Sequence, residues 1–530
     1  MRAHRSRADG FRAPARLSLV PLAVLAAVAA VAVPAPAAAS DDLARAHEVG
    51  RISTPAYRLE RARSLVRLGA VRRRYPGAER PGAHDVTGIL RDLRATISLL
   101  RDDERREAER LLARPPAGSG DADLHGWPDG VPMRTLCSEV CLHWIETSRA
   151  APPLADEDES GVPDWVERSL EALDGSIARF DALGYRRPRS DLASSSPELD
   201  GRLDVYLGDL GSHGYFGYCT TDDNAAWHAK RVSAYCVLDD DYLDPELRVR
   251  SPLAGLRATA AHELFHAVQF AYDWLEDLWL MEGTATWIED VAFPGVHDSL
   301  RYLPRSPVGR PHVPLDVGRG GFLYGNWIFW RYAAERLGRG VVRETWERAG
   351  RDTYSLAAAR RAVEARGLSF PRLFSSFAAA NRVPATAYRE GHLYPRAQAF
   401  AAYGLGDARP AVSDSTRVAH LASKTIAFRA ASALGPRSLA LEVTIGRGIA
   451  SSRVTALVVR PGGDVERRRI VLDGNGSGRA VVPFGLGVRR VDLVLANAGT
   501  SYRCWRGTAL SCGGVSLDDG RPFAFSAALR

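Results

Sequence analysis

Beyond its first forty residues, the sequence lacks any hydrophobic run long enough to cross a bilayer. It also lacks an internal repeat, a phosphate-binding loop and a Gly-x-Ser-x-Gly elbow, which argues against solenoids, P-loop nucleotide binding and serine hydrolases of the elbow type. Cysteine is scarce, with six in 530 residues. The remaining composition, 46% hydrophobic and 25% charged, is typical of a globular chain with two or three domains.

The first forty residues have the pattern of an export signal. An Arg-rich start precedes an apolar stretch from Leu17 to Val33, and Ala37-Ala38-Ala39 follows before Ser40. We therefore expect a signal peptide over residues 1–39 and a secreted, extracellular product. An uncleaved membrane anchor is the alternative, although the stretch is short and Ala-rich for one.

Net charge is distributed unevenly along the chain. Residues 1–40 hold five Arg and one Asp, and residues 41–115 hold 17 Arg and 12 acids, so of the total of +7 only −2 is left for residues 116–530. Because residues 116–530, the largest part of the chain, are near neutral, nucleic acid is not an expected partner.

The segment His262-Glu263-Leu264-Phe265-His266 carries the strongest chemical signal. Ser251-Pro252 is a good helix start, and residues four apart on a helix point the same way, so both imidazoles can bind one zinc ion. Glu263 would then act as general base toward a water that the zinc polarises. Apolar residues gather on the opposite face, so we expect one face on the core and the other on a cleft. Two hydrogen-bonded core histidines are the alternative interpretation.

A catalytic zinc site needs three protein ligands and one open position. Glu282 is the expected third ligand, 16 residues after His266 at the start of a second expected helix. Thr286 and Glu289 share its face at i+4 and i+7. Glu289 is expected to orient a histidine by accepting its N–H, and the alternative is that Glu289 is itself the ligand.

The run Asp277 to Gly283 resembles the third-ligand segment of gluzincins, the thermolysin-like and aminopeptidase-N-like zinc peptidases. The resemblance implies that His262, His266 and Glu282 are zinc ligands and that Glu263 is the general base. A Gly-x-Met-Glu-Asn segment is absent, which counts against an aminopeptidase, and Thr286 stands where thermolysin-like enzymes have Asp. A closer similarity, over about residues 41–400, is to a poorly characterised group of secreted bacterial proteins classed as metalloproteases.

Residues 156–167 match the calcium-binding loop of EF-hands. The matching positions carry oxygen ligands and a Gly at the bend, whereas Ser at position 5 and Pro163 at position 8 weaken the pattern. A structural calcium site and a solvated acidic turn both remain open. The expected calcium ligands are Asp156, Asp158, Ser160, Val162, Asp164 and Glu167.

A further donor usually stabilises the oxyanion that forms when a peptide carbonyl is attacked. Tyr324 follows a Gly pair at the start of an expected helix and is the first candidate for this catalytic role, and His312 is the second. The alternative for Tyr324 is a half-buried helix tyrosine.

Six cysteines in an exported chain predict up to three disulfides. Nearest-neighbour pairing gives Cys137–Cys141, Cys219–Cys236 and Cys504–Cys512. We favour the last two pairs, because the first lies in an expected strand, where a three-residue gap is awkward to bridge.

The pattern along the chain predicts an α+β fold in which a zincin-like catalytic domain carries the HExxH helix. Residues 40–116 are helical, either as a propeptide that blocks the cleft or as a domain that stays attached. Residues 117–132 form a linker, 133–405 the catalytic domain and 406–530 a β-sandwich, in which Asp473-Gly474-Asn475-Gly476 indicates a hairpin turn.

The expected function is that of a secreted zinc metalloprotease, with Zn²⁺ as cofactor and Ca²⁺ as a candidate second ion. Its partners are a protein or peptide substrate, with no membrane anchor after signal cleavage and a monomeric state. The alternative is a non-catalytic extracellular binding protein on a peptidase fold. Retention of Glu263 argues against it, since a structural zinc site needs no base.

Overall fold

The computed structural model describes most of the chain after the expected signal peptide, which at residues 1–39 lies outside the described residues. Residues 117–123 of the expected linker also lie outside them. The described residues are 41–115, 124–193, 200–223, 226, 228–351, 353–431, 434–446 and 448–530.

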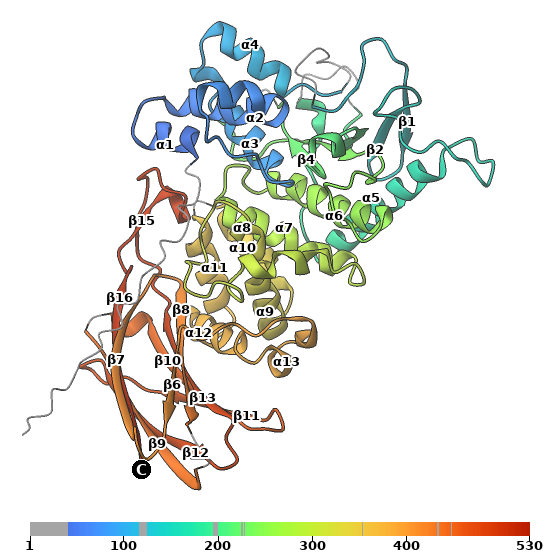
Figure 1. The fold of residues 1–530 in the computed structure, drawn as a ribbon. Coiled ribbons are helices and arrows are strands. Elements are labelled where there is room, and N and C mark those ends of the chain that lie inside the picture. Colours follow the sequence, from blue (N-terminus) through green and yellow to red (C-terminus); the bar gives the residue numbers. More distant parts are fainter. Residues whose placement is uncertain are drawn as a thin grey trace, which may run out of the picture. The chain divides into compact units, whose positions relative to one another are not determined.

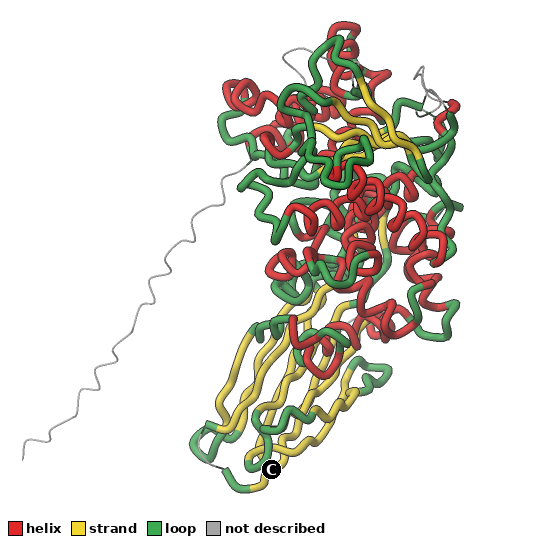
Figure 2. Tube along the Cα trace, turned by 90° about the vertical axis from the view of Figure 1, so that its right-hand side faces the viewer, coloured by secondary structure: helices red, strands yellow, loops and turns green. Residues whose placement is uncertain are grey.

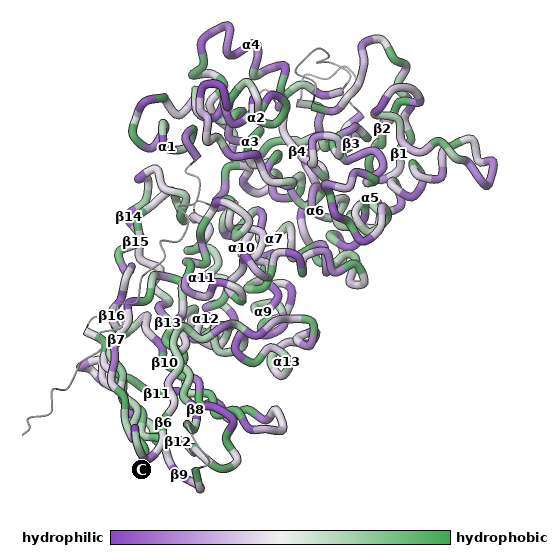
Figure 3. Tube along the Cα trace, viewed as in Figure 1, coloured by the Kyte–Doolittle hydropathy of each residue, from purple (hydrophilic) through white to green (hydrophobic). Residues whose placement is uncertain are grey.

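Helices form the first part of the described chain (Figure 1). Asp41 caps the first of them, because its Oδ1 accepts the N–H of Leu43 at 3.1 Å. The last is coloured mostly as hydrophilic in Figure 3 and buries only Ala108 and Leu111. The four helices are α1 (Asp42–Glu48), α2 (Thr54–Arg74), α3 (Val86–Arg94) and α4 (Asp102–Leu111).

A five-stranded sheet follows, with the strand order β1-β2-β3-β5-β4. Neighbours β2, β3 and β5 pair in parallel, whereas β1 and β4 are antiparallel to their neighbours and lie at the two edges. The strands are β1 (Met133–Cys137), β2 (Cys141–Ile145), β3 (Asp204–Gly208), β4 (Gly217–Thr220) and β5 (Tyr235–Asp239).

Both faces of strands β2 to β5 are buried, because their side chains alternate between two cores, whereas β1 is largely exposed. Val205 and Leu238 pack in the main core with helices α5 (Asp164–Ala182) and α6 (Pro252–Phe270). Tyr206 and Val237, one residue away in each strand, pack with the N-terminal helices. The N-terminal helices therefore complete the packing of the sheet.

Three disulfides link the chain, at Cys137–Cys141, Cys219–Cys236 and Cys504–Cys512. The last two pairings are confirmed, and the doubt about the first was wrong. Cys137 and Cys141 face each other across the β1–β2 hairpin with Cα atoms 4.1 Å apart, so the short gap is a tight turn rather than a stretch of strand.

A group of helices follows the sheet. The helix α6 begins as expected, with Ser251 Oγ accepting the N–H of Ala254 at 3.2 Å and Pro252 in the first turn. The later helices are α7 (Leu278–Ala292), α8 (Phe322–Gly325), α9 (Trp327–Leu337), α10 (Gly340–Ala349), α11 (Ser355–Glu364), α12 (Phe370–Ala380) and α13 (Pro384–Ala387). Short 3₁₀ helices connect the elements at Ile97–Leu99, Asp191–Ala193, Gly211–His213, Asp298–Arg305, Gly391–Leu393, Ile449–Ser451 and Ser511–Gly513.

The last part of the chain forms a five-stranded and a four-stranded sheet around their own core, and Figure 2 shows their long strands side by side. One sheet has the order β11-β10-β13-β8-β6 and the other the order β12-β9-β16-β7, while β14 and β15 form a separate pair. The strands are β6 (Ala401–Leu405), β7 (Ala411–Val418), β8 (Ala422–Ala430), β9 (Pro436–Ile445), β10 (Ser452–Val459), β11 (Val465–Ile470), β12 (Ser477–Gly485), β13 (Arg490–Asn497), β14 (Tyr502–Arg503), β15 (Val515–Ser516) and β16 (Arg521–Leu529).

Two expectations about this part of the chain need correction. Residues 401–405 were assigned to the preceding domain, but they form β6 and pair in parallel with β8. The turn Asp473 to Gly476 is present, with the Gly476 N–H donating to Asp473 O at 3.0 Å. It does not close a hairpin, because β11 and β12 on its two sides belong to different sheets.

The structure is thus of mixed α+β composition, with β-sheets at its C-terminal end. Among the described residues, no helix is both long enough and apolar enough to cross a membrane.

Candidate metal centre

The helices α6 and α7 pack against each other and bring three polar side chains together. Glu282 Oε2 lies 3.2 Å from His262 Nε2 and 3.5 Å from His266 Nε2. One ligand atom from each residue lies within 4.8 Å of the other two, and all three residues are at most 1% exposed. Two imidazoles and one carboxylate form a ligand set typical of zinc.

The second nitrogen of each histidine is held by a side chain outside this trio. His262 Nδ1 donates to Glu289 Oε1 at 2.7 Å, and His266 Nδ1 donates to Gln269 Oε1 at 2.8 Å. Gln269 is fixed in turn, since its Nε2 donates to Met281 O at 2.9 Å. These hydrogen bonds turn both Nε2 atoms toward Glu282, an arrangement common around metal-binding histidines.

The unpaired atoms of the site fit a metal ion. Among the described residues, the buried His266 Nε2 and Glu263 Oε1 have no hydrogen-bond partner. A buried polar atom without a partner is costly, and a cation bound at His262, His266 and Glu282 would satisfy the imidazole nitrogen.

The electrostatics of the trio also favour positive charge at its centre. Burial acts to raise the pKa of Glu282, but His266 and His262 outweigh it and hold this pKa below its ordinary value. Burial acts to lower the pKa of His262, but hydrogen bonds with Glu282 and Glu289 raise it well above the usual range. Burial raises the pKa of Glu289 to about 8.

Glu263 is fully buried beside the trio. Its Oε2 accepts the hydroxyl of Thr87 at 3.0 Å. Burial raises the pKa of its carboxyl above the ordinary value, although His262 and His266 act to lower it. A carboxylate with one unpaired oxygen and a raised pKa is suited to accept and return a proton.

The expected cleft is not open in this structure. The face of α6 that carries the two histidines is buried, and the residues that cover it include His84, in the loop before α3, and Thr87, in the first turn of α3. His84 lies with its ring centroid 5.2 Å from that of His262, and Thr87 contacts Glu263. Burial, together with the charges of His262 and Arg301, lowers the pKa of His84 well below its usual range.

Tyr324 lies in α8 with its ring centroid 6.4 Å from that of His262. Its hydroxyl donates to Asp85 Oδ1 at 2.7 Å, and burial raises its pKa well above the ordinary value. His312 is exposed, and the charged groups that lower its pKa besides burial are Lys424 and Arg310. It is therefore not among the residues that the structure gathers around the histidine pair.

The acidic loop before α5 also draws its expected ligands together. Carboxylate oxygens of Asp156, Asp158 and Asp164 lie within 4.8 Å of one another. Ser160 Oγ lies 3.2 Å from Val162 O and 3.0 Å from Glu167 Oε1, and its one proton can be donated to either. The bend falls at Gly161, whose φ of 85° suits glycine. No helix precedes the loop between residues 146 and 155, whereas α5 begins directly at Asp164.

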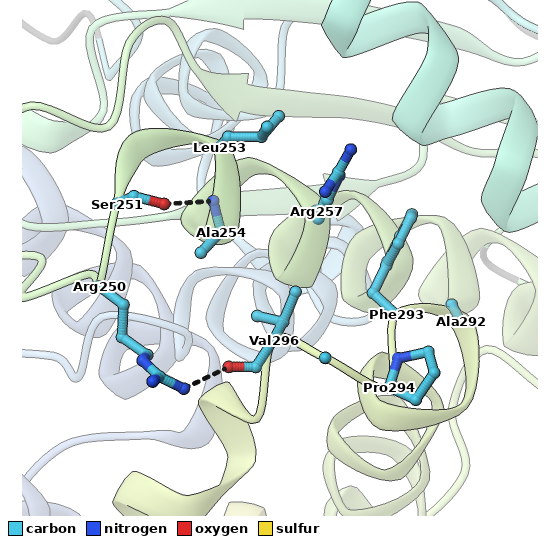
Figure 4. Close-up of a pocket in the computed structure, with 10 residues that line it drawn as sticks. Arg250, Ser251, Leu253, Ala254, Arg257, Ala292, Phe293, Pro294 and Val296 are labelled. Atoms are coloured by element: carbon cyan, nitrogen blue, oxygen red, sulfur yellow. Dashed lines mark hydrogen bonds between the residues drawn. The ribbon is translucent and has the colours of Figure 1, made fainter.

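A surface pocket of about 490 Å³ lies at the start of α6 (Figure 4). Arg250 closes one side, with its Nη1 donating to Val296 O at 3.2 Å. Its lining residues do not include His262, His266 or Glu282. The pocket is therefore separate from the candidate centre.

Three of the residues at the centre were missed by the sequence analysis. Gln269 had a local signal, since it lies three residues after His266 on the same helix. His84 and Thr87 had none, because they reach the centre only through the packing of α3 on β4.

Comparison with protein-family models gives no match, and comparison with curated proteins gives none either. Among solved structures, a periplasmic inhibitor of g-type lysozyme from Aeromonas hydrophila, PliG, is 13% identical, covering 24% of this chain and 95% of that one with a TM-score of 0.15. The pre-peptidase C-terminal domain of a collagenase from Bacillus anthracis is 12% identical, covering 25% and 97% with a TM-score of 0.16. With TM-scores this low, these likenesses support no inference about this chain.

Proposed function

We propose that this chain is a secreted zinc-dependent metallopeptidase with a zincin-like catalytic domain. The observation that carries the proposal is the convergence of His262, His266 and Glu282, with the unpaired oxygen of Glu263 beside them. Three disulfides fit an extracellular setting. Zinc at this centre would polarise the scissile carbonyl and make water a nucleophile near neutral pH.

The remaining steps, which are metal binding, proton transfer and oxyanion stabilisation, fall to different side chains. His262, His266 and Glu282 hold the ion, while Glu289 and Gln269 fix the two rings. Glu263 takes a proton from the attacking water and returns it to the leaving amine. Tyr324 is the candidate donor to the oxyanion, once its hydroxyl leaves Asp85.

The alternative function is that of a non-catalytic extracellular binding protein. It would use the C-terminal sandwich for binding and keep the metal only for stability. The fully buried carboxyl of Glu263, whose Oε1 has no partner among the described residues, favours the peptidase, because an acid held there without a catalytic role would only cost stability.

The test compares the secreted chain with Glu263→Gln for zinc content and casein cleavage. Cleavage is measured before and after trimming at the linker residues Asp121 and Asp123 with endoproteinase Glu-C in phosphate buffer, which is then blocked by a serine-protease inhibitor, because N-terminal residues cover Glu263. We expect one equivalent of zinc in both proteins and a loss of cleavage of about 10²–10⁴-fold in the variant. Glu171→Gln, the same change at an exposed position of α5, should leave both unchanged.

Equal cleavage by Glu263→Gln and the wild type would exclude the proposed mechanism. Retention of the full zinc content by the His262→Ala variant would exclude the proposed metal site. Chelator inhibition that is reversed by zinc and not by calcium separates this centre from the acidic loop.

A further inference from the structure

Residues 83–87 lie along the free edge of the five-stranded sheet, where β4 faces α3. The Phe216 N–H, at the start of this edge, donates to Ala83 O at 3.2 Å. The Cys219 N–H donates to Thr87 Oγ1 at 2.9 Å. An exposed strand edge offers such groups to any extended peptide, so this segment occupies a place where a peptide could pair.

Within this segment, His84 is the residue whose surroundings indicate metal binding. It is 6% exposed, and its ring stacks on Phe216 with centroids 4.4 Å apart. Neither ring nitrogen has a hydrogen-bond partner among the described residues. A ligand atom of His84 lies within 4.8 Å of those of His262 and Glu263. A buried imidazole with two unpaired nitrogens next to a metal-binding trio is explained by coordination of the same ion.

The neighbours of His84 form hydrogen bonds with the two other proposed catalytic groups. The Thr87 hydroxyl donates to Glu263 Oε2 at 3.0 Å, so it engages the general base. Asp85 Oδ1 accepts the hydroxyl of Tyr324 at 2.7 Å. One short segment thus contacts the metal trio, the base and the candidate oxyanion donor.

Contacts of α3 hold the segment in place. Arg91 Nη1 donates to Glu276 O at 2.7 Å, in the turn just before α7. Gly88 lies so close to α7 that a Cβ there would meet Leu278 Cδ2 at 3.1 Å. Because the segment belongs to the same chain, its effective concentration at the centre is high.

We infer that the intact chain is autoinhibited, with His84 as a fourth protein ligand that closes the metal centre. This inference rests on the proposed zinc peptidase. Four protein ligands are typical of closed structural zinc sites, whereas a catalytic site keeps one position for water. Activity then requires that residues 83–87 leave the edge of β4.

The decisive measurement is X-ray absorption of the zinc-loaded secreted chain, which counts imidazole ligands without any assay of activity. We expect three imidazoles in the wild type and two in His84→Ala. Zinc affinity, measured by chelator competition, should fall by about 10-fold or more, as for the loss of supporting groups at other zinc sites. Casein cleavage by the untrimmed chain should rise at least about 10-fold in His84→Ala, because a segment that the ion no longer holds leaves the edge of β4 more readily and water regains its position.

His47→Ala is the matched control, because His47 lies in the same N-terminal part but hydrogen-bonds to Thr54 instead. It should leave all three readouts unchanged. If His84→Ala fails to fold, His84→Phe preserves the stacking on Phe216 and removes only the nitrogens. It should also give two imidazoles, while the untrimmed chain stays poorly active.

Two imidazoles in both the wild type and the His84 variants would overturn the inference and leave the proposed function intact, provided that Glu263-dependent cleavage is found. A chain that binds no zinc would overturn both. Three imidazoles in the wild type with no cleavage after trimming would support the His84 ligand and contradict the peptidase.

Discussion

At the scale of single residues, Gly217 determines how closely α6 approaches the sheet. A Cβ at this position of β4 would lie 2.8 Å from Thr259 Cγ2, 3.0 Å from Glu263 Cγ and 3.1 Å from Val237 O. Glycine therefore allows the Glu263 side chain to pack directly against β4.

We expect Gly217→Ala to destabilise the protein by about 1–3 kcal/mol, because the added methyl overpacks the contact between β4 and α6. It should also displace the Glu263 side chain and, under the proposed function, lower casein cleavage by the trimmed chain. Urea unfolding and the cleavage assay measure the two effects. Gly175→Ala is the control, since a Cβ there meets no atom within 4 Å and alanine favours the exposed helix by about 0.5–1 kcal/mol. Equal stability changes in the two variants would contradict the packing argument.

The residues of the centre differ in how far the sequence could place them. His262 and His266 share a helical face, and so do Glu282 and Glu289, because i+4 and i+7 spacing is a local property. His84 lies 178 positions before His262, and no periodicity links the two. Its place depends on the tertiary packing of α3 against β4, which a local pattern does not encode.

At the scale of elements, local patterns located strands but did not assign them to sheets. The turn Asp473 to Gly476 has the residues of a hairpin, yet the chain crosses there from one sheet of the sandwich to the other. Turn chemistry sets the local bend, whereas pairing is decided by which face is buried. Pairing also decides where β6 belongs. This short strand pairs in parallel with β8 of the sandwich, and no local pattern in residues 401–405 indicates that partner.

For the acidic loop of residues 156–167, the sequence left open a structural calcium site and a solvated acidic turn. The carboxylates of Asp156, Asp158 and Asp164 gather, but Ser160 and Gly161 N–H groups also satisfy Asp156. These backbone hydrogen bonds, which outweigh the effect of burial, keep the pKa of Asp156 below its ordinary value. The Asp156 carboxylate therefore stays charged, as calcium binding requires.

We expect calcium to stabilise the protein by about 2.7 kcal/mol at a concentration 100 times its Kd, because only the folded loop presents all the ligands. Urea unfolding with and without calcium, in the presence of saturating zinc, measures this gain. Asp158→Asn should reduce it, and Glu157→Gln, at a position that the calcium pattern does not use, should leave it unchanged. A gain that persists in Asp158→Asn would favour the solvated acidic turn.

At the scale of the whole described chain, buried polar pairs join the helices to the C-terminal sheets. Arg382, just after α12, donates from Nη2 to Asp492 Oδ2 of β13 at 2.9 Å. Asp316 accepts from His420 Nε2 at 3.1 Å and from the Ser511 N–H at 3.0 Å. Apolar contacts between α12 and strands β10 and β13 accompany them. The sequence indicated a separate C-terminal sandwich but not these pairs, because their partners are distant in the chain.

The pair of Asp316 and His420 should make the stability of this junction depend on pH. Burial acts to lower the pKa of His420, but the hydrogen bond and charge of Asp316 raise it above 6.5. Burial acts to raise the pKa of Asp316, but His420 and Tyr502 hold it below 3.8. The contribution of His420 is therefore complete below pH 6.5 and is lost as the pH rises through its raised pKa. That of Asp316 is complete above its unfolded pKa and is lost on acidification.

We expect His420→Gln to destabilise the protein by about 3 kcal/mol near pH 5.5, because it leaves Asp316 buried without its charged partner. The difference from the wild type should shrink as the pH rises above 6.5 and through the raised pKa of His420, where the folded wild type loses this proton. Urea unfolding at pH 5.5, 7 and 8.5 measures it, with the exposed His392→Gln as the control. A difference that grows with pH would mean that His420 is neutral in the folded protein. The pair would then join the two parts of the chain through a neutral hydrogen bond, and acidification would weaken this junction.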